Sequence, residues 1–148
     1  MGEEMRVVVI DDSQEHLNMM ERWLRREPWI EAILALKNDI GVTNTVRSFD
    51  PDVVMMDLLM PRISGEELLE IMMRDDQVPD ACYVVFSGGD ATTLRRVQLR
   101  TGAELALSKS VDLQHVAHHI RSFEGRRDEK RKKRLLFEKI GGPRPCDS

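Results

Sequence analysis

Several apolar runs of this chain end in a polar residue of a type that could do chemistry. The clearest run is VVMMDLLMP, residues 53–61, in which Asp57 is the one charged residue. A buried carboxylate without a partner is unfavourable, so this run either ends at a surface or lies beside a cation. The other polar residues that follow apolar runs are Asp11, Asp12, Ser87, Ser108 and Lys109.

Residues of these types could together perform phosphoryl transfer. Three carboxylates in one site repel one another unless protons or a cation offset their charge. A hard divalent ion such as Mg²⁺, or Mn²⁺, takes oxygen ligands and usually retains waters, so carboxylates and a backbone carbonyl can hold it. Lys109 adds positive charge without occupying a coordination position. Catalysis of phosphoryl transfer is mostly positioning and charge neutralisation, which such a group of residues provides.

The segments that must position these residues alternate between two kinds. Short runs rich in Val, Ile and Leu are followed by longer segments of helical periodicity, which is typical of βα units around a parallel sheet. The pattern predicts an α/β fold, a flavodoxin-like doubly wound five-stranded parallel sheet with five helices. Sites of this fold lie beyond the carboxyl ends of the strands, so the polar residues there should meet. The predicted strands are 6–10, 30–36, 52–56, 81–87 and 104–108.

Capping residues predict where several helices begin and end. Ser13 and Asp90 are predicted N-caps, and Gly102 is predicted to end the fourth helix. The second helix is predicted over 42–49, and the third is expected to end near residues 75–76.

These motifs resemble the receiver domain of two-component response regulators, and the chain is similar to the stand-alone chemotaxis type. The resemblance covers roughly residues 5–124. It rests on the acidic pair after the first strand, MMDLLMPRISG around Asp57, and the ends of the fourth and fifth strands. Taken singly, each residue has an ordinary explanation as a helix cap, a loop acid or a surface charge. Their joint occurrence at the right strand ends favours the receiver.

The resemblance implies a role for each residue of the site. Asp57 would accept a phosphoryl group from a histidine kinase or phosphotransfer protein. Ser87 would hydrogen-bond that group, and Lys109 would pair with it. The implied ligands of Mg²⁺, or Mn²⁺, are Asp12, Asp57 and the backbone carbonyl of Leu59, with Asp11 acting directly or through water.

Two residues depart from the family pattern. Ser110 follows Lys109 where the family commonly has a proline after a cis peptide bond. A cis bond before another residue costs about 3 kcal/mol, so this loop is expected to be strained or differently shaped. Ala106 stands where the family usually has an aromatic residue that reports phosphorylation. Without that aromatic switch, we expect the loop at 88–89 and the fourth helix to carry the change of state.

Two alternatives to a phosphoacceptor remain. The first is a phosphorylation-independent pseudo-receiver that only binds other proteins, which Ala106 and Ser110 keep open. The second is an aspartate-based phosphohydrolase, but such enzymes usually carry an acid two residues after the nucleophile, where Leu59 stands. Neither Leu59 nor Gly89 can orient an attacking water, so we expect slow self-dephosphorylation rather than turnover of a substrate.

The charge of the chain is unevenly distributed. It has 22 basic and 26 acidic residues, a net charge of −4, but residues 125–148 are basic. We expect a receiver domain over 1–124 and a basic C-terminal extension over 125–148, helical or disordered. A helix could also continue through Gly125. The motif KRKKR could be simply exposed, or could meet an acidic partner, a phosphate backbone or anionic lipid, with LLF as an apolar anchor.

The extension is too short for a familiar output domain. We therefore expect a stand-alone regulator that signals by altered binding to a downstream protein, with a homodimer possible. The sequence has no helix-turn-helix pattern or aromatic interleaving, so sequence-specific DNA binding is not expected. No apolar stretch approaches the length of a membrane span, and the chain is expected to be cytoplasmic.

The cysteines and histidines are predicted to be ordinary core and surface residues. Cys82 and Cys146 do not suggest a disulfide framework, which fits a reducing compartment, and Cys82 is predicted to be a core residue. The spacing of His115 and His119, with His118 beside them, could bind a transition metal, but a polar helix face is the favoured explanation.

Overall fold

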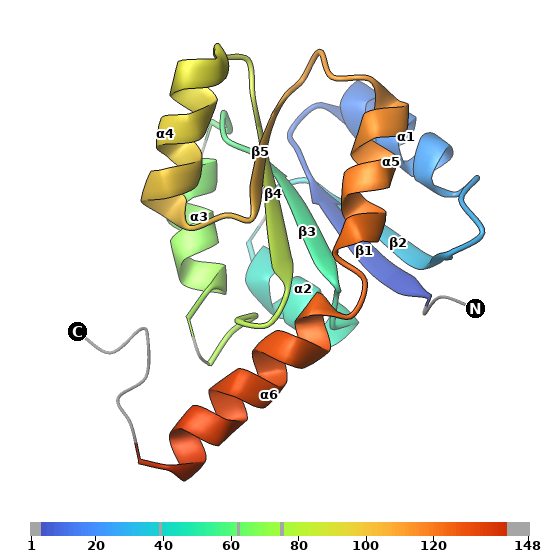
Figure 1. The fold of residues 1–148 in the computed structure, drawn as a ribbon. Helices are drawn as coiled ribbons and strands as arrows, with labels where there is room; N and C mark the ends of the chain where they lie inside the picture. The colour runs from blue at the N-terminus through green and yellow to red at the C-terminus, as the bar shows by residue number, and fades with distance from the viewer. Residues whose placement is uncertain (1–3, 39, 62, 75, 142–148) are drawn as a thin grey trace.

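The computed structural model describes residues 4–38, 40–61, 63–74 and 76–141. Five parallel strands form one sheet, and their residue ranges agree closely with those predicted. The strands are β1 (Met5–Ile10), β2 (Ile30–Leu36), β3 (Val53–Asp57), β4 (Cys82–Ser87) and β5 (Leu105–Ser108). Their order in the sheet is β2-β1-β3-β4-β5, so the predicted flavodoxin-like fold is confirmed (Figure 1).

Helices follow the strands in alternation, and a sixth helix follows the last of the five predicted. They are α1 (Gln14–Leu24), α2 (Val42–Phe49), α3 (Gly65–Met72), α4 (Ala91–Thr101), α5 (Leu113–Ser122) and α6 (Arg126–Lys139). Ser13 and Asp90 cap α1 and α4 by accepting backbone N–H groups, and Gly102 ends α4 at φ 78°, as predicted. The third helix ends at Met72, a few residues earlier than the predicted end near residues 75–76, of which residue 75 lies outside the described residues.

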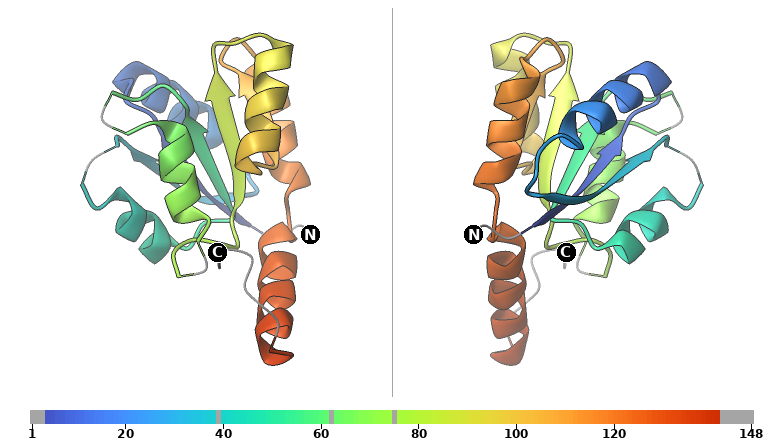
Figure 2. Two further views of the ribbon diagram at one scale, coloured as in Figure 1. Left: turned by 90° about the vertical axis from the view of Figure 1, so that its left-hand side faces the viewer. Right: turned by 90° about the vertical axis from the view of Figure 1, so that its right-hand side faces the viewer.

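Two hydrophobic cores lie on opposite faces of the sheet, because successive strand residues point to opposite sides. Helices α1 and α5 cover one face, and α2, α3 and α4 cover the other (Figure 2). In β1, for example, Val8 and Ile10 face α2 and α3, whereas Val7 and Val9 face α1 and α5. Every residue of β3 is buried, as expected for a central strand of a parallel sheet.

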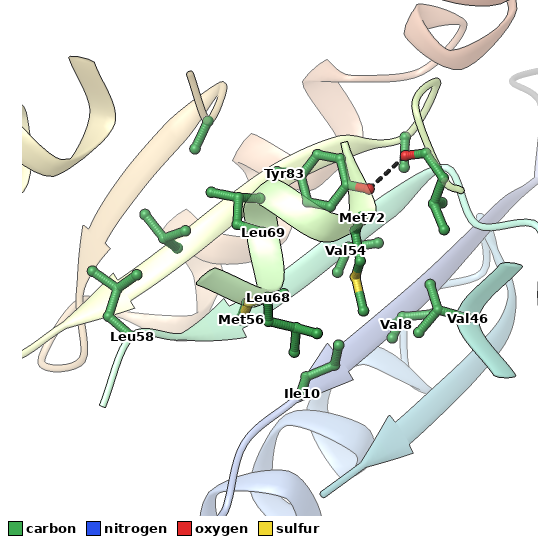
Figure 3. Packing of buried hydrophobic residues seen from close by; sticks show 14 of the residues in the cluster. Val8, Ile10, Val46, Val54, Met56, Leu58, Leu68, Leu69, Met72 and Tyr83 are labelled. Atoms are coloured by element: carbon green, nitrogen blue, oxygen red, sulfur yellow. Dashed lines mark hydrogen bonds between the residues drawn. The ribbon is translucent and has the colours of Figure 1, made fainter. Parts of the chain in front are cut away.

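The core beneath α3 packs aliphatic, methionine and aromatic side chains (Figure 3). Its largest member, Tyr83, is fully buried and donates its hydroxyl hydrogen to the carbonyl of Val78 at 2.5 Å. Cys82 is a buried core residue, as predicted, and burial raises the pKa of its thiol to about 12. Cys146 lies outside the described residues.

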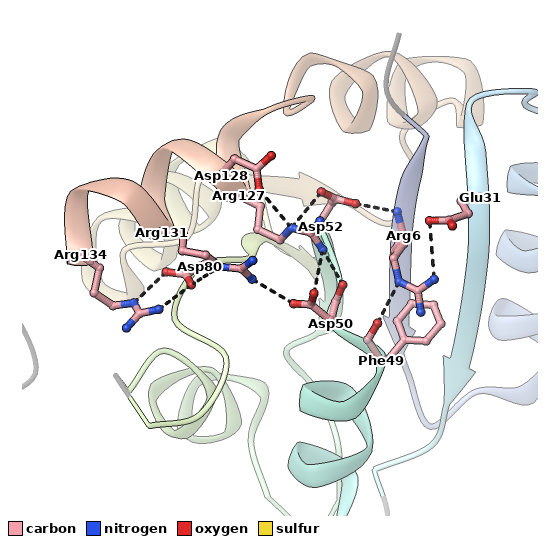
Figure 4. A network of polar contacts seen from close by, with 10 residues as sticks. All are labelled: Arg6, Glu31, Phe49, Asp50, Asp52, Asp80, Arg127, Asp128, Arg131 and Arg134. Atoms are coloured by element: carbon pink, nitrogen blue, oxygen red, sulfur yellow. Dashed lines mark hydrogen bonds and ion pairs between the residues drawn. The ribbon is translucent and has the colours of Figure 1, made fainter. Parts of the chain in front are cut away.

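The chain does not continue α5 through Gly125 but turns there, at φ 80°, and begins α6. No described residue of α6 is buried, so ionic contacts rather than apolar packing hold it against the rest of the chain (Figure 4). Four basic residues spaced i, i+3, i+4 and i+7 lie on one helix face. We call their contacts the α6 ion-pair network: Arg127, Lys130, Arg131 and Arg134 with Asp50, Asp52, Asp80 and Glu104.

This network lies at the amino-terminal ends of β3, β4 and β5. Lys130 Nζ donates to the carbonyl of Ala81 at 2.7 Å and to Glu104 Oε1 at 2.8 Å. Glu104 Oε2 in turn accepts the backbone N–H of Tyr83 at 2.6 Å. Three of the five basic residues of KRKKR thus pair with the chain's own carboxylates, whereas Lys132 and Lys133 are exposed.

Within the described part of the chain, no helix has the length and apolar content needed to cross a bilayer.

Candidate phosphoacceptor site

The sheet brings the predicted polar residues to one edge. β1 and β3 are adjacent, with Ile10 opposite Met56, so the residues after Ile10 lie beside Asp57. On the other side, Asp57 pairs with Phe86 of β4, and the next residue, Ser87, pairs with Ser108 of β5. Lys109 follows Ser108, and its backbone N–H donates to the carbonyl of Ser87 at 3.2 Å.

Asp57 is a buried carboxylate, 4% exposed, at the end of the central strand. Its Oδ1 accepts the backbone N–H of Leu59 at 3.1 Å, and its Oδ2 accepts Lys109 Nζ at 2.9 Å. The apolar strand therefore ends at Asp57, and the ammonium group of Lys109 faces the Asp57 carboxylate. Since the Nζ–Oδ2 contact is both a hydrogen bond and an ion pair, it offsets the unfavourable burial of this charge.

Lys109 bridges two carboxylates. In addition to its contact with Asp57, its Nζ lies 3.4 Å from Oδ2 of Asp11. Burial lowers the pKa of the ammonium group, but its hydrogen bond to Asp57 and the charges of both carboxylates outweigh this effect, and the pKa is raised. Lys109 is therefore positively charged throughout the physiological range.

Asp11 is more deeply buried than Asp57, at 1% exposed. Its Oδ1 accepts the backbone N–H of Ser13 at 2.9 Å, and its Oδ2 lies 2.5 Å from Nδ1 of His16. Burial raises the pKa of this carboxyl group, but the hydrogen bonds from His16 and Ser13 and the charge of Lys109 outweigh it. The pKa of Asp11 is lowered, so the carboxylate is ionised at neutral pH.

The remaining predicted residues lie around this group without joining its ion pairs. Asp12 is half-buried, and its Oδ1 accepts the backbone N–H of Asn38 at a long 3.4 Å. The hydroxyl oxygen of Ser87 accepts the backbone N–H of Gly89 at 3.2 Å. The side chain of Leu59 is exposed, at 76%, beside the acid.

Comparison with known families agrees with this geometry. The profile described as "Response regulator receiver domain" matches residues 7–121, which is most of the chain. The chain belongs to the response regulator receiver family. The receiver is 30% identical over 108 residues to the transcriptional regulatory protein DegU of Brevibacillus brevis, covering 73% of the chain and 45% of DegU. It spans less than half the length of the curated relatives that it matches.

Solved structures show the same fold. The signal receiver domain from Bermanella marisrubri superposes with a TM-score of 0.70 at 24% identity, covering 82% of this receiver and 98% of that chain. The receiver domain of Saccharomyces cerevisiae Ssk1, solved with the histidine phosphotransfer protein Ypd1, gives 0.70 at 20% identity, covering 84% and 91%. At these identities the likeness shows the fold alone.

The two departures from the family pattern have different structural outcomes. The described residues contain no cis peptide bond, so the loop after Lys109 is differently shaped rather than held in that conformation. Its turn is closed by Ser108 Oγ, which lies 2.8 Å from Ser110 Oγ and accepts the N–H of Ser110 at 3.2 Å. Ala106, in the middle of β5, is half-buried and packs at the margin of one core. It leaves no aromatic ring to change rotamer there.

The donor atoms of the site fit a hard divalent cation. Asp11, Asp12 and Asp57 supply oxygen atoms only, and Mg²⁺ is usually held by one or two carboxylates plus waters rather than by a closed protein cage. Among the described residues, no three or more His, Cys, Asp or Glu side chains form a closed cage around one point.

One glycine fixes the path of the chain beside the acid. A Cβ atom at Gly65 would lie 2.4 Å from the carbonyl oxygen of Asp57 and 2.7 Å from the Cα of Leu58. The N–H of Gly65 donates to the carbonyl of Leu58 at 3.1 Å, which closes the loop onto the end of β3. Any side chain at this position would push the loop away from Asp57.

Two residues of the site were not found from the sequence. His16 contacts Asp11, and buried Asn38 contacts Asp12 and the carbonyl of Ile63. His16 could have been found, because it stands three residues after the N-cap Ser13, where a side chain often folds back over the start of the helix. The sequence around Asn38 contains no comparable signal, such as a helix cap. The histidines of α5 lie elsewhere: His115 and His118 are exposed and His119 is half-buried.

Proposed function

We propose that this receiver accepts a phosphoryl group on Asp57 from the phosphohistidine of a histidine kinase or phosphotransfer protein. The observation that carries the proposal is the position of Lys109 Nζ, 2.9 Å from Asp57 Oδ2 and 3.4 Å from Asp11 Oδ2. The Lys109 ammonium group lies between two buried carboxylates, so it can stay close to the Asp57 side chain when one of the Asp57 oxygens bonds to phosphorus. The solved complex of a receiver with the phosphotransfer protein Ypd1 supports this class of partner.

In this reaction an Asp57 oxygen attacks phosphorus, a P–O bond forms, and the P–N bond of the donor breaks. The donor imidazole takes up a proton as it leaves. Lys109 stabilises the negative charge that gathers on the phosphoryl oxygens, and the hydroxyl of Ser87 can donate to one of them. Asp11, Asp12, Asp57 and the carbonyl of Leu59 would hold Mg²⁺ or Mn²⁺, which when bound adds neutralising charge to the same oxygens.

We propose further that the chain acts as a stand-alone regulator, whose output is altered binding to a downstream protein. With Ala106 in place of an aromatic residue, the change passes from Ser87 through Gly89 into α4. The bond from Gly89 N–H to Ser87 Oγ supports this route, because it couples any movement of the Ser87 side chain to the loop that leads into α4. The exposed apolar residues of α6 offer a surface for a partner: Leu135, Leu136, Phe137 and Ile140.

The deciding experiment incubates the protein with acetyl phosphate and MgCl₂ and weighs the intact chain by mass spectrometry. We expect one added phosphoryl group in the wild type and none in Asp57→Asn. The matched control, Asp128→Asn, removes an exposed carboxylate of α6 and should be labelled like the wild type. An unlabelled wild type would instead favour the pseudo-receiver, in which the Lys109–Asp57 contact is a permanent structural ion pair.

A further inference from the structure

His16 occupies a position from which it must reach back toward the site. It stands at the third residue of α1, and its backbone N–H donates to the N-cap oxygen of Ser13 at 3.2 Å. Side chains in this turn point back toward the start of the helix, here toward the end of β1. The imidazole therefore lies over Asp11 rather than in solvent, and the side chain is 14% exposed.

Two contacts fix the imidazole ring. Nδ1 lies 2.5 Å from Asp11 Oδ2, and the ring meets Phe86 edge to face, with centroids 5.8 Å apart and planes at 79°. A carboxylate can only accept a hydrogen bond, so Nδ1 carries the hydrogen in this pair. Phe86 is itself 3% exposed and belongs to β4, the strand that ends in Ser87.

The histidine determines which way the Asp11 carboxylate faces. Ser13 N–H holds Oδ1, whereas His16 Nδ1 and Lys109 Nζ both approach Oδ2. A carboxylate offers about four lone-pair positions, so three such contacts leave one position for a cation or for a water bound to it. Without His16, nothing on the α1 side would hold Oδ2, and the carboxylate could rotate toward Lys109.

We propose that His16 is a positioning residue, which holds Asp11 in the orientation that a divalent cation requires at this site. The assignment of the cation to this site rests on the proposed phosphoryl-accepting function. Partners of metal-ligating side chains typically change metal affinity by about 10-fold or more when they are removed.

The test is calorimetric titration of MgCl₂ into four purified proteins. His16→Leu removes the hydrogen bond, and we expect it to weaken Mg²⁺ binding by about 10-fold. His16→Asn places an amide N–H close to the position of Nδ1, and we expect affinity within about 2-fold of the wild type. The matched control, His118→Leu, changes an exposed histidine on α5 and should leave Mg²⁺ affinity unchanged.

Equal or tighter Mg²⁺ binding by His16→Leu would overturn the proposal, and so would a His16→Asn variant as weak as His16→Leu. A wild type that binds no Mg²⁺ would overturn it as well. Should His16→Leu fail to fold, nitrogen-15 spectra of metal-free wild type give a second readout. The proposal requires a hydrogen on Nδ1 that is protected from exchange, and an unprotonated Nδ1 would refute it.

Phosphorylation is scored separately, so the two proposals can fail separately. We expect the MgCl₂ concentration that half-saturates labelling by acetyl phosphate to rise by about 10-fold in His16→Leu, in step with the loss of Mg²⁺ affinity. Binding of Mg²⁺ that depends on His16, in a protein that never accepts a phosphoryl group, would refute the proposed function alone. Normal labelling combined with Mg²⁺ binding that is indifferent to His16 would refute the positioning role alone.

Discussion

Arg134 and Asp80 form a two-point ion pair, in which Nε donates to Oδ1 at 3.0 Å and Nη2 donates to Oδ2 at 2.9 Å. Asp80 is 7% exposed, and Arg131 also approaches it at 3.3 Å. Bidentate pairs of this kind are the stronger class of ionic contact. Asp80 therefore links the loop before β4 to the middle of α6, beside the contact of Lys130 with the carbonyl of Ala81.

Loss of the Asp80 carboxylate should weaken the attachment of α6 to the rest of the chain. We expect Asp80→Asn to lower the free energy of unfolding by about 1–2 kcal/mol, because two guanidinium groups lose a partly buried charged partner. Urea denaturation measures the loss, and amide hydrogen exchange in 126–139 should accelerate. Asp128→Asn, which changes an exposed acid on the same helix, serves as the control. Unchanged exchange in α6 would mean that other contacts hold the helix.

Acid should weaken the fold in part through the same carboxylate. Burial raises the pKa of Asp80, but hydrogen bonds and charge from Arg134 and Arg131 outweigh it, so its folded-state pKa lies below the ordinary 3.8. A carboxyl with a lowered pKa stabilises the folded state above its unfolded pKa, and this contribution is lost as pH falls through the folded pKa. We expect the free energy of unfolding to decrease as the pH is lowered below about 3.8. The decrease should be less steep in Asp80→Asn than in the wild type. Equal slopes would contradict this.

A side chain at Gly65 should damage both stability and the site. Gly65→Ala places a Cβ 2.4 Å from the carbonyl oxygen of Asp57, where backbone must move. We expect a loss of about 2–3 kcal/mol in the free energy of unfolding, together with slower labelling of Asp57. Gly88→Ala is a matched control near the site, because a Cβ there meets nothing within 4 Å. Comparable losses in both variants would remove the steric explanation.

The exposed side chain of Leu59 should set the lifetime of the acyl phosphate. An apolar group at this position cannot hold a water for attack on phosphorus, whereas an amide can. We expect Leu59→Asn to lose its phosphoryl group several-fold faster than wild type, measured as phosphate release after the donor is removed. Leu99→Asn changes an equally exposed leucine on α4, 75% against 76%, and should not alter the rate. A half-life unaffected by Leu59→Asn would place the control of lifetime elsewhere.

Phosphorylation should move the loop after β4 and the helix that follows. Ala106 provides no rotamer switch, so we expect changes in amide chemical shift to concentrate in residues 88–108. Residues 30–33, in the amino-terminal half of the edge strand β2, provide an internal reference, because they lie at the end of the sheet away from Asp57. Spectra without shifts in 88–108 on labelling would exclude this route.

The strands, the helix ends and the edge of the sheet that carries the site could be predicted from the sequence, because local signals mark the ends of each element. Runs of Val and Met mark the buried strands, and Ser13, Asp90 and Gly102 mark helix ends in a way that needs no long-range information. The grouping of Asp11, Asp57 and Lys109 then follows from topology alone. Each of these predictions depends on the type of a residue and its local sequence, and not on contacts with residues far away in the chain.

The contacts made by α6 could not be predicted in the same way. KRKKR has the composition of a surface tail, and its carboxylate partners are 26 to 81 residues earlier in the chain, in loops without a motif of their own. Pairing of this kind depends on where the turn at Gly125 directs the helix. The sequence indicates an acidic body and a basic tail, but only the structure shows that they neutralise each other.

The position of α6 has a practical consequence for anyone who trims the chain to the matched family segment, 7–121. Such a fragment lacks α6 and therefore the basic residues that pair with Asp50, Asp52, Asp80 and Glu104. These four carboxylates lie at the end of the sheet opposite Asp57. Four uncovered carboxylates at the ends of neighbouring strands repel one another, so the fragment should unfold more easily than the longer chain, and the difference should be largest at low ionic strength.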